Sequence, residues 1–197
     1  MPKKIEQFNI VIVGTGGQGL ITLLQIIAEA SLASGLDVKT SELHGLSQRG
    51  GSVEVHIRFG QDIYSPMVAQ GKADLVLALE IQESLRATYF ANPKTIFLID
   101  KHLIPISLQK PLPEPQILKT LKKISKKIKT IKAADICQKE FGTGVTAGIY
   151  LLGLATFRKF LPLKHQAILA AIRKVIPEQY LNLNLKTFTL AKKHAKK

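Results

Sequence analysis

Cysteine is almost absent from this 197-residue chain, which has a single one, at position 137. One thiol cannot form an internal disulfide, nor can it hold an iron–sulfur cluster, which needs about four thiolates. Low cysteine use is typical of a reducing compartment, so we expect a cytoplasmic protein. The first residues lack an apolar signal core, and no apolar run reaches the roughly 18–20 residues that cross a bilayer, so we expect neither export nor a membrane.

The sequence also lacks several motifs of self-sufficient enzymes. It has no G-x-x-x-x-G-K-[ST] segment, which argues against a Walker-type NTPase. It has no G-x-S-x-G elbow, which argues against a serine hydrolase of that type. Its His, Cys, Asp and Glu residues do not have the spacing of a metal site, so we expect no metal on this chain.

Acidic residues are few, 14 against 28 lysines and arginines, and the net charge is +14. Much of the excess lies in residues 119–132 and 192–197. Only five of the 28 basic residues are arginines, the better bidentate phosphate ligands, and the basic segments lack interleaved aromatic residues for base stacking. We therefore expect no nucleic-acid partner and favour docking to an acidic partner. Residues 191–197 are predicted to be a frayed basic tail.

Strand and helix patterns alternate along the chain. The predicted strands are residues 9–13, 37–42, 53–59, 73–79, 95–99 and 128–133, with a short hairpin arm at 63–65. The predicted helices are residues 20–34, 81–91, 145–160 and 164–176, and one that begins near 117. A right-handed crossover over residues 9–42 makes the first two strands parallel in one sheet. The alternation predicts a single α/β domain over residues 1–197, Rossmann-like, with three layers and a mostly parallel sheet.

A glycine-rich turn connects the first predicted strand to the first helix. Its candidate binding residues are Gly14, Gly16, Gly17, Gln18 and Gly19. The glycines fit G-x-G-x-x-G, and the free N–H groups of the helix N-terminus suit an anion. Glu42, at the end of the second strand, is near where a ribose-binding acid would lie. Three interpretations stay open: a dinucleotide site, glycines that only permit tight packing, or contact with a partner subunit through the Gln18 amide.

Residues 41–53 carry the densest set of polar side chains in the chain. They follow a strand, on the edge where ligands bind in open α/β sheets. His44 can hydrogen-bond or carry a proton near neutral pH. Arg49 can clamp a carboxylate or a phosphate with two N–H groups. A well hydrogen-bonded surface loop is the other interpretation of the same residues.

Two acids, Glu80 and Asp100, end predicted buried strands and so point to the same edge of the sheet. Helix capping or local ion pairing, for example between Glu83 and Arg86, explains such acids equally without a ligand. For Cys137 we favour a small buried residue over a reactive thiol. The other candidate, His56, is interpreted as a structural or surface residue rather than a ligand.

The two loops together resemble a known family. Residues 14–19, the pattern Ser-Glu-x-His-Gly-x-x-Gln-Arg-Gly-Gly-Ser-Val over 41–53, Ser-Pro at 65–66 and Glu-x-x-Glu-x-x-Arg over 80–86 are similar to the gamma-type domain of 2-oxoacid:ferredoxin oxidoreductases. The form of the second loop found here, His-Gly-x-x-Gln-Arg-Gly-Gly over residues 44–51, most resembles that of the beta subunit of indolepyruvate:ferredoxin oxidoreductases. The resemblance is strong over residues 8–100 and weaker beyond.

The resemblance implies a small subunit that is active only in a complex. The reaction is oxidative decarboxylation of an aryl or other 2-oxoacid to an acyl-CoA, with electrons passed to ferredoxin and coenzyme A as co-substrate. Thiamine diphosphate and [4Fe-4S] clusters are expected on a large partner subunit, since this chain has one cysteine and no G-D-G…N-N motif. His44, Gln48 and Arg49 then face the partner's active site. The alternative is a free-standing NAD(P)- or other nucleotide-binding protein that uses Glu42.

Overall fold

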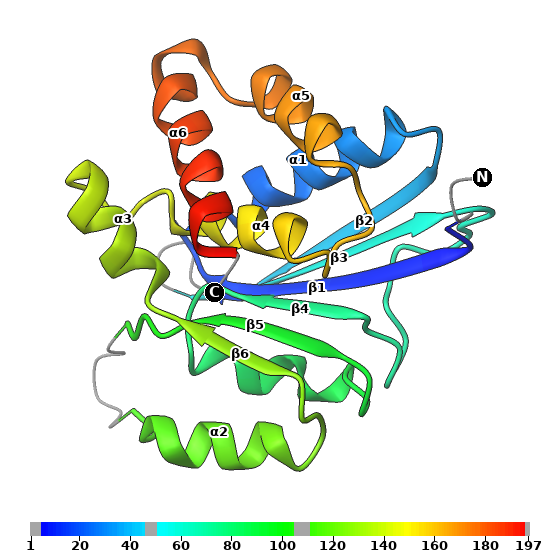
Figure 1. The fold of residues 1–197 in the computed structure, drawn as a ribbon. Helices are drawn as coiled ribbons and strands as arrows, with labels where there is room; N and C mark the ends of the chain where they lie inside the picture. Colours follow the sequence, from blue (N-terminus) through cyan, green and yellow to red (C-terminus); the bar gives the residue numbers. More distant parts are fainter. Residues whose placement is uncertain (1–4, 46–50, 105–110, 196–197) are drawn as a thin grey trace.

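A six-stranded sheet runs through the molecule in the order β2-β3-β1-β4-β5-β6 (Figure 1). The computed structural model describes residues 5–45, 51–104 and 111–195, and of His44 the backbone alone. The strands are β1 (Gln7–Thr15), β2 (Asp37–His44), β3 (Ser52–Gly60), β4 (Leu75–Ala78), β5 (Ile96–Asp100) and β6 (Ile128–Ile131). The apolar runs of β1, β4 and β5 are buried on both faces, as expected for strands covered on both sides.

Five strands run in one direction, and β3 runs against both of its neighbours. The first two predicted strands are parallel in one sheet, as expected, but they are not neighbours. The segment after β2 turns the chain back, so β3 pairs with β2 and then occupies the place beside β1. The alternation predicted for residues 53–59 is confirmed, because its four apolar side chains are buried.

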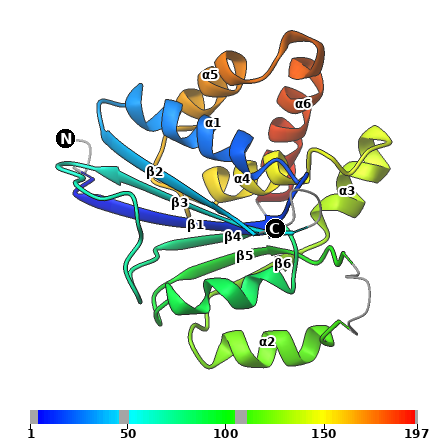
Figure 2. The same ribbon diagram turned by 180° about the vertical axis from the view of Figure 1, so that it is seen from behind.

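Helices cover both faces of the sheet, which confirms the three-layer prediction (Figures 1 and 2). One face carries α1 (Leu20–Leu32), α3 (Ala133–Phe141), α4 (Ala147–Phe157), α5 (His165–Val175) and α6 (Glu178–Ala195). The other face carries η1 (Glu83–Tyr89), a 3-10 helix, and α2 (Glu114–Lys122). A separate hydrophobic cluster fills the space on each face.

Some predicted elements are wrong or shorter. Residues 63–65 form no strand, because Arg58 instead binds the carbonyl oxygens of Ser65 and Met67. The helix predicted over 81–91 is the 3-10 helix η1. The frayed tail is wrong for residues 191–195, which complete α6: Ala191 is buried and His194 Nδ1 lies 2.6 Å from the hydroxyl of Tyr150. Apolar packing against α4 therefore outweighs the repulsion among the basic residues of this helix.

Candidate functional site

The glycine-rich turn has the backbone that its sequence predicts. Gly17 and Gly19 have φ values of 98° and 78°, in the left-handed region that glycine adopts without strain. Gly19 is the N-cap of α1, and among the residues that the structure describes no side chain caps that helix. The first N–H groups of α1 therefore remain available at the carboxyl edge of the sheet.

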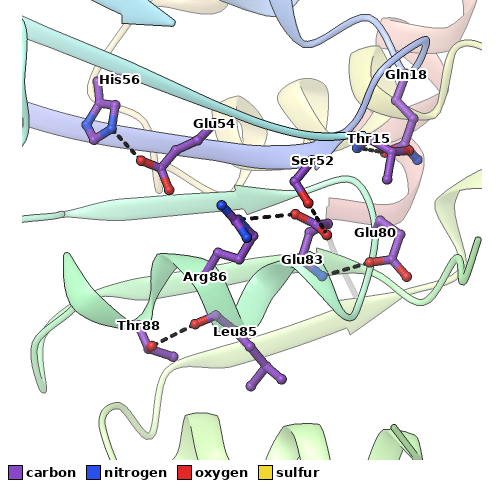
Figure 3. Close-up of polar contacts among 10 residues, drawn as sticks. All are labelled: Thr15, Gln18, Ser52, Glu54, His56, Glu80, Glu83, Leu85, Arg86 and Thr88. Carbon is purple, nitrogen blue, oxygen red and sulfur yellow. Dashed lines mark hydrogen bonds and ion pairs between the residues drawn. The ribbon is translucent and has the colours of Figure 1, made fainter. Parts of the chain in front are cut away.

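Gln18 folds back over the turn and joins two strands. Its Oε1 accepts the Thr15 N–H at 2.8 Å (Figure 3). Its Nε2 donates to the Leu79 carbonyl oxygen at 2.9 Å. Leu79 directly follows β4, so this amide closes the gap between the ends of β1 and β4. A Cβ on Gly14 would lie 2.7 Å from Gln18 Oε1. Tight packing, one of the three interpretations of the glycines, therefore holds at Gly14.

The second loop begins and ends beside the glycine turn. The Gly16 N–H donates to the carbonyl oxygen of Gly51 at 2.9 Å, and the Gly45 N–H donates to that of Ser52 at 3.1 Å. The backbone of His44 pairs with Val53 at the end of β2. Gln48 and Arg49 lie outside the described residues, as does the side chain of His44. The fold thus brings the roots of both predicted loops to one edge of the sheet.

Buried carboxyl groups lie below these roots, on the η1 face (Figure 3). Ser52 Oγ donates to Glu83 Oε1 at 2.9 Å, and Arg86 Nε lies 3.6 Å from Glu83 Oε2. The Glu83 N–H donates to Glu80 Oε2 at 2.7 Å. Burial raises the pKa of both carboxyl groups above the usual range. Hydrogen bonds partly oppose that shift, from the N–H of Glu83 at Glu80 and from Ser52 at Glu83.

Asp100 is buried and binds the start of α3. Its two carboxyl oxygens accept the N–H groups of Ala133 at 2.8 Å and Ala134 at 3.1 Å. Burial raises its pKa against those hydrogen bonds. Helix capping therefore explains both acids that end strands, since Glu80 serves the first turn of η1 in the same way.

A pocket of about 410 Å³ opens at the carboxyl ends of β4 and β5. Its walls include Gly17 and Gln18 from the turn, Asp100 and His102 after β5, and Val145 and Gly148 at the start of α4. Here the chain passes from β1 to α1 on one face and from β4 to η1 on the other. Such a divergence is where open α/β sheets bind ligands.

A second, more apolar pocket of about 490 Å³ lies behind the turn, between α1, α4 and the start of α6. Gln18, Val145 and Gly148 line both pockets, so the glycine turn and the chain at the start of α4 separate them. The sequence patterns did not predict this wall between the pockets. Residues 142–148 could have indicated it, because they repeat the pattern of glycines before a helix.

Comparison with known proteins identifies the family. Residues 9–193 match the family described as pyruvate ferredoxin/flavodoxin oxidoreductase. The indolepyruvate oxidoreductase subunit IorB of Archaeoglobus fulgidus is 35% identical over 189 residues, which cover 93% of each chain. This chain belongs to the pyruvate ferredoxin/flavodoxin oxidoreductase family. Within that family it is a small subunit of the IorB type, which confirms the resemblance drawn from its two loops.

Solved structures share the fold of this family member. The gamma subunit of a keto/oxoacid ferredoxin oxidoreductase from Geobacter sulfurreducens has a TM-score of 0.70 at 22% identity, over 96% of this chain and 98% of that one. A 2-oxoglutarate:ferredoxin oxidoreductase from Magnetococcus marinus has a TM-score of 0.71 at 20% identity. The match covers 97% of this chain but 31% of that longer one, so the same fold also occurs there as part of a larger polypeptide.

Glu42 does not lie where a dinucleotide site needs it. It is on β2, and β3 separates β2 from β1. Neighbouring strands are about 4.8 Å apart, so the inserted strand moves Glu42 roughly one strand spacing away from the glycine turn. This strand order does not support the expectation that Glu42 lies near a ribose position, and the free-standing nucleotide-binding alternative is not favoured for this family member.

The two remaining candidates are structural, as interpreted. His56 is fully buried, accepts the Val68 N–H at Nδ1 and contacts Glu54 through Nε2 at 2.9 Å. Cys137 is buried in the α1-side cluster, and burial raises its pKa to about 11. A thiol with that pKa is protonated at neutral pH and is a poor nucleophile.

Within the described parts of the chain, no group of three or more His, Cys, Asp or Glu side chains is arranged to hold a metal ion. The helices described there also fall short of the length and apolarity required to cross a bilayer.

Proposed function

We propose that this chain is the small subunit of an indolepyruvate-type 2-oxoacid:ferredoxin oxidoreductase. The complex would decarboxylate an aryl or other 2-oxoacid oxidatively to its acyl-CoA and pass the electrons to ferredoxin. Thiamine diphosphate and [4Fe-4S] clusters would lie on the large partner subunit. The relatives named IorB support the indolepyruvate type. The Magnetococcus marinus enzyme, solved with coenzyme A and succinyl-CoA bound, supports an acyl-CoA product.

The observation that carries this proposal is the meeting of the two loops at one sheet edge. The Gly16–Gly51 hydrogen bond holds the end of the 44–51 segment against the glycine turn, next to the 410 Å³ pocket. The sole cysteine is buried with a raised pKa, so this chain offers no thiolate set for a cluster. A subunit that completes a partner's active site would contribute such an edge and would not need a redox centre of its own.

In the complex, each loop would have a separate task. Gly14, Gly16, Gly17, Gln18 and Gly19 would shape the turn whose N–H groups face a phosphate of coenzyme A. Arg49 would bind a carboxylate or phosphate through two N–H groups, His44 would supply a hydrogen bond, and Gln48 would orient the loop. Glu42 would not take part in a ribose contact.

Co-expression with the large subunit tests this proposal. In the purified complex, Arg49→Ala should raise the KM for coenzyme A or for the 2-oxoacid by about 10- to 100-fold, the worth of one charge-assisted bidentate contact. The measurement is 2-oxoacid-dependent dye reduction with varied coenzyme A. Arg173→Ala, a change of the same residue type on the exposed side of α5, should leave both constants unchanged.

Two results would count against the proposal. If Arg49→Ala leaves turnover and both KM values unchanged, Arg49 does not face the active site. If the isolated chain oxidises a 2-oxoacid unaided, the division of cofactors between two subunits is wrong.

A further inference from the structure

Ser52 stands at the junction of the two loops and the sheet. It is the first residue of β3, directly after the 45–51 segment, and it pairs with Thr15 of β1. Its carbonyl oxygen accepts the Gly45 N–H, and the carbonyl oxygen of the preceding residue accepts the Gly16 N–H. Whatever fixes Ser52 therefore fixes both ends of the segment and its contact with the glycine turn.

The side chain that fixes Ser52 is Glu83 on η1. Its Oε1 accepts the Ser52 hydroxyl at 2.9 Å, although the two residues are 31 positions apart in the sequence. The Glu83 side chain is 7% exposed, and among the described residues its Oε2 has no hydrogen bond. In the described parts of the chain, the cation paired with Glu83 is Arg86, which is 58% exposed, while the charge of Glu54 opposes ionisation.

Burying a carboxyl group that has so few hydrogen bonds and so exposed an ion-pair partner destabilises the folded chain. The burial of Glu83 therefore needs an explanation other than stability. Glu83 and Arg86 could form their i,i+3 ion pair equally well in geometry with the carboxyl at the surface, so that pair does not require the burial. The position of η1 is itself fixed, because Glu80 Oε2 accepts the Glu83 N–H at 2.7 Å. Glu83 is thus a rigid support aimed at Ser52.

We propose that Glu83 is a positioning residue that, through Ser52, locks the ends of the 45–51 segment against the glycine turn. This inference rests on the proposed function, because the locked segment connects His44 to β3 and contains Gln48 and Arg49. Glu83 touches neither substrate nor cofactor, and it acts by setting where those side chains start. The support comes from η1, on the opposite sheet face from α1 (Figures 1 and 2).

Amide hydrogen exchange of the full-length chain, followed by NMR, tests the lock. Ser52→Ala and Glu83→Ala should each speed exchange at the Gly16 and Gly45 amides about tenfold, as expected when a buried hydrogen bond is lost. The double variant should exchange no faster than either single variant. Glu83→Gln keeps an acceptor for Ser52 and should stay near the parent rates. Glu140→Ala, an exposed change on α3, is the matched control.

The lock is disproved if Ser52→Ala leaves both amides at the parent rates, or if the two single effects add in the double variant. Ser52→Ala decides the matter even where Glu83→Ala does not fold. In the co-expressed complex, Glu83→Ala should raise the KM for coenzyme A with little change in kcat, and Glu83→Gln should restore it. Faster exchange with unchanged kinetic constants would uphold the lock and contradict the placement of the loop in the active site.

Discussion

At the scale of single residues, the edge of the sheet depends on Gly14 and Gln18 together. Gly14 has no side chain, and the Gln18 amide fills that space while it bridges Thr15 and Leu79. The G-x-G-x-x-G spacing predicted the turn because glycine spacing reports backbone conformation. It did not predict that Gln18 would bind inside the chain, because the partner atom belongs to Leu79, 61 positions away in the sequence.

Gly14→Ala should destabilise the chain by about 1–3 kcal/mol, the usual cost of an added methyl group in a well-packed site. The new Cβ would meet Gln18 Oε1 at 2.7 Å and Leu79 Cβ at 3.2 Å, so Gln18 must swing away and lose both hydrogen bonds. Urea unfolding measures the loss. Gly144→Ala meets nothing closer than 3.4 Å and should change stability by less than about 0.5 kcal/mol. Equal effects at the two positions would contradict the packing argument.

Glu80 makes stability depend on pH. Burial raises its pKa above the ordinary 4.5, so the folded chain holds this proton more tightly than the unfolded chain. Its contribution is therefore complete below pH 4.5 and is lost as the pH rises through the folded-state pKa. Glu80→Gln stays neutral and still accepts the Glu83 N–H. Its stability relative to the parent should thus increase with pH above 4.5, by at most about 1.4 kcal/mol per pH unit.

Urea unfolding of both proteins between pH 4.5 and 8 checks this slope. Glu140→Gln makes the same chemical change at an exposed position on α3 and is the matched control variant. A Glu80→Gln difference that is flat, or that falls as the pH rises, would mean that the pKa of this carboxyl is not raised in the folded chain.

At the scale of elements, the sequence predicted the secondary structure of each segment well. It predicted the neighbours of each strand in the sheet less well. Apolar runs identified β1, β4 and β5, because a strand that is buried on both faces is apolar throughout. Alternation identified β3, because a strand with one apolar face has an apolar residue at every second position. Strand neighbours leave no such pattern, so the place of β3 between β2 and β1 could not be read. Residues 128–131 form the predicted last strand, β6. The helical state of 191–195 depends on contacts with α4, which the lysine-rich sequence does not reveal.

The start of α3 depends on Asp100. Asp100→Ala removes the acceptor for the Ala133 and Ala134 amides and should cost about 1–2 kcal/mol, as the loss of a capping side chain does. Asp100→Asn keeps one carbonyl oxygen and should lose less. Urea unfolding gives the stabilities, and faster exchange at those two amides would localise the effect. If the alanine variant is as stable as the parent, the desolvation penalty of the Asp100 carboxyl is as large as the stabilisation from its hydrogen bonds.

At the scale of the whole molecule, the order of the strands decides between the two functions that the sequence left open. A dinucleotide fold places the second strand directly beside the first, so that its terminal acid reaches the ribose next to the glycine turn. Here the antiparallel β3 takes that place, and Glu42 lies on the edge strand. The glycine pattern correctly predicted the turn between β1 and α1. A nicotinamide cofactor also needs an acid beside that turn, and the strand order places Glu42 one strand further away.

The purified chain should therefore show no micromolar binding of NADH or NADPH by isothermal titration calorimetry. Without a ribose acid beside the turn, the N–H groups of α1 can attract a phosphate but cannot fix the rest of a dinucleotide. Glu42→Ala should leave the titration curves unchanged. A dissociation constant in the micromolar range that Glu42→Ala weakens tenfold would overturn this argument, because Glu42 would then reach the ribose in spite of the inserted strand.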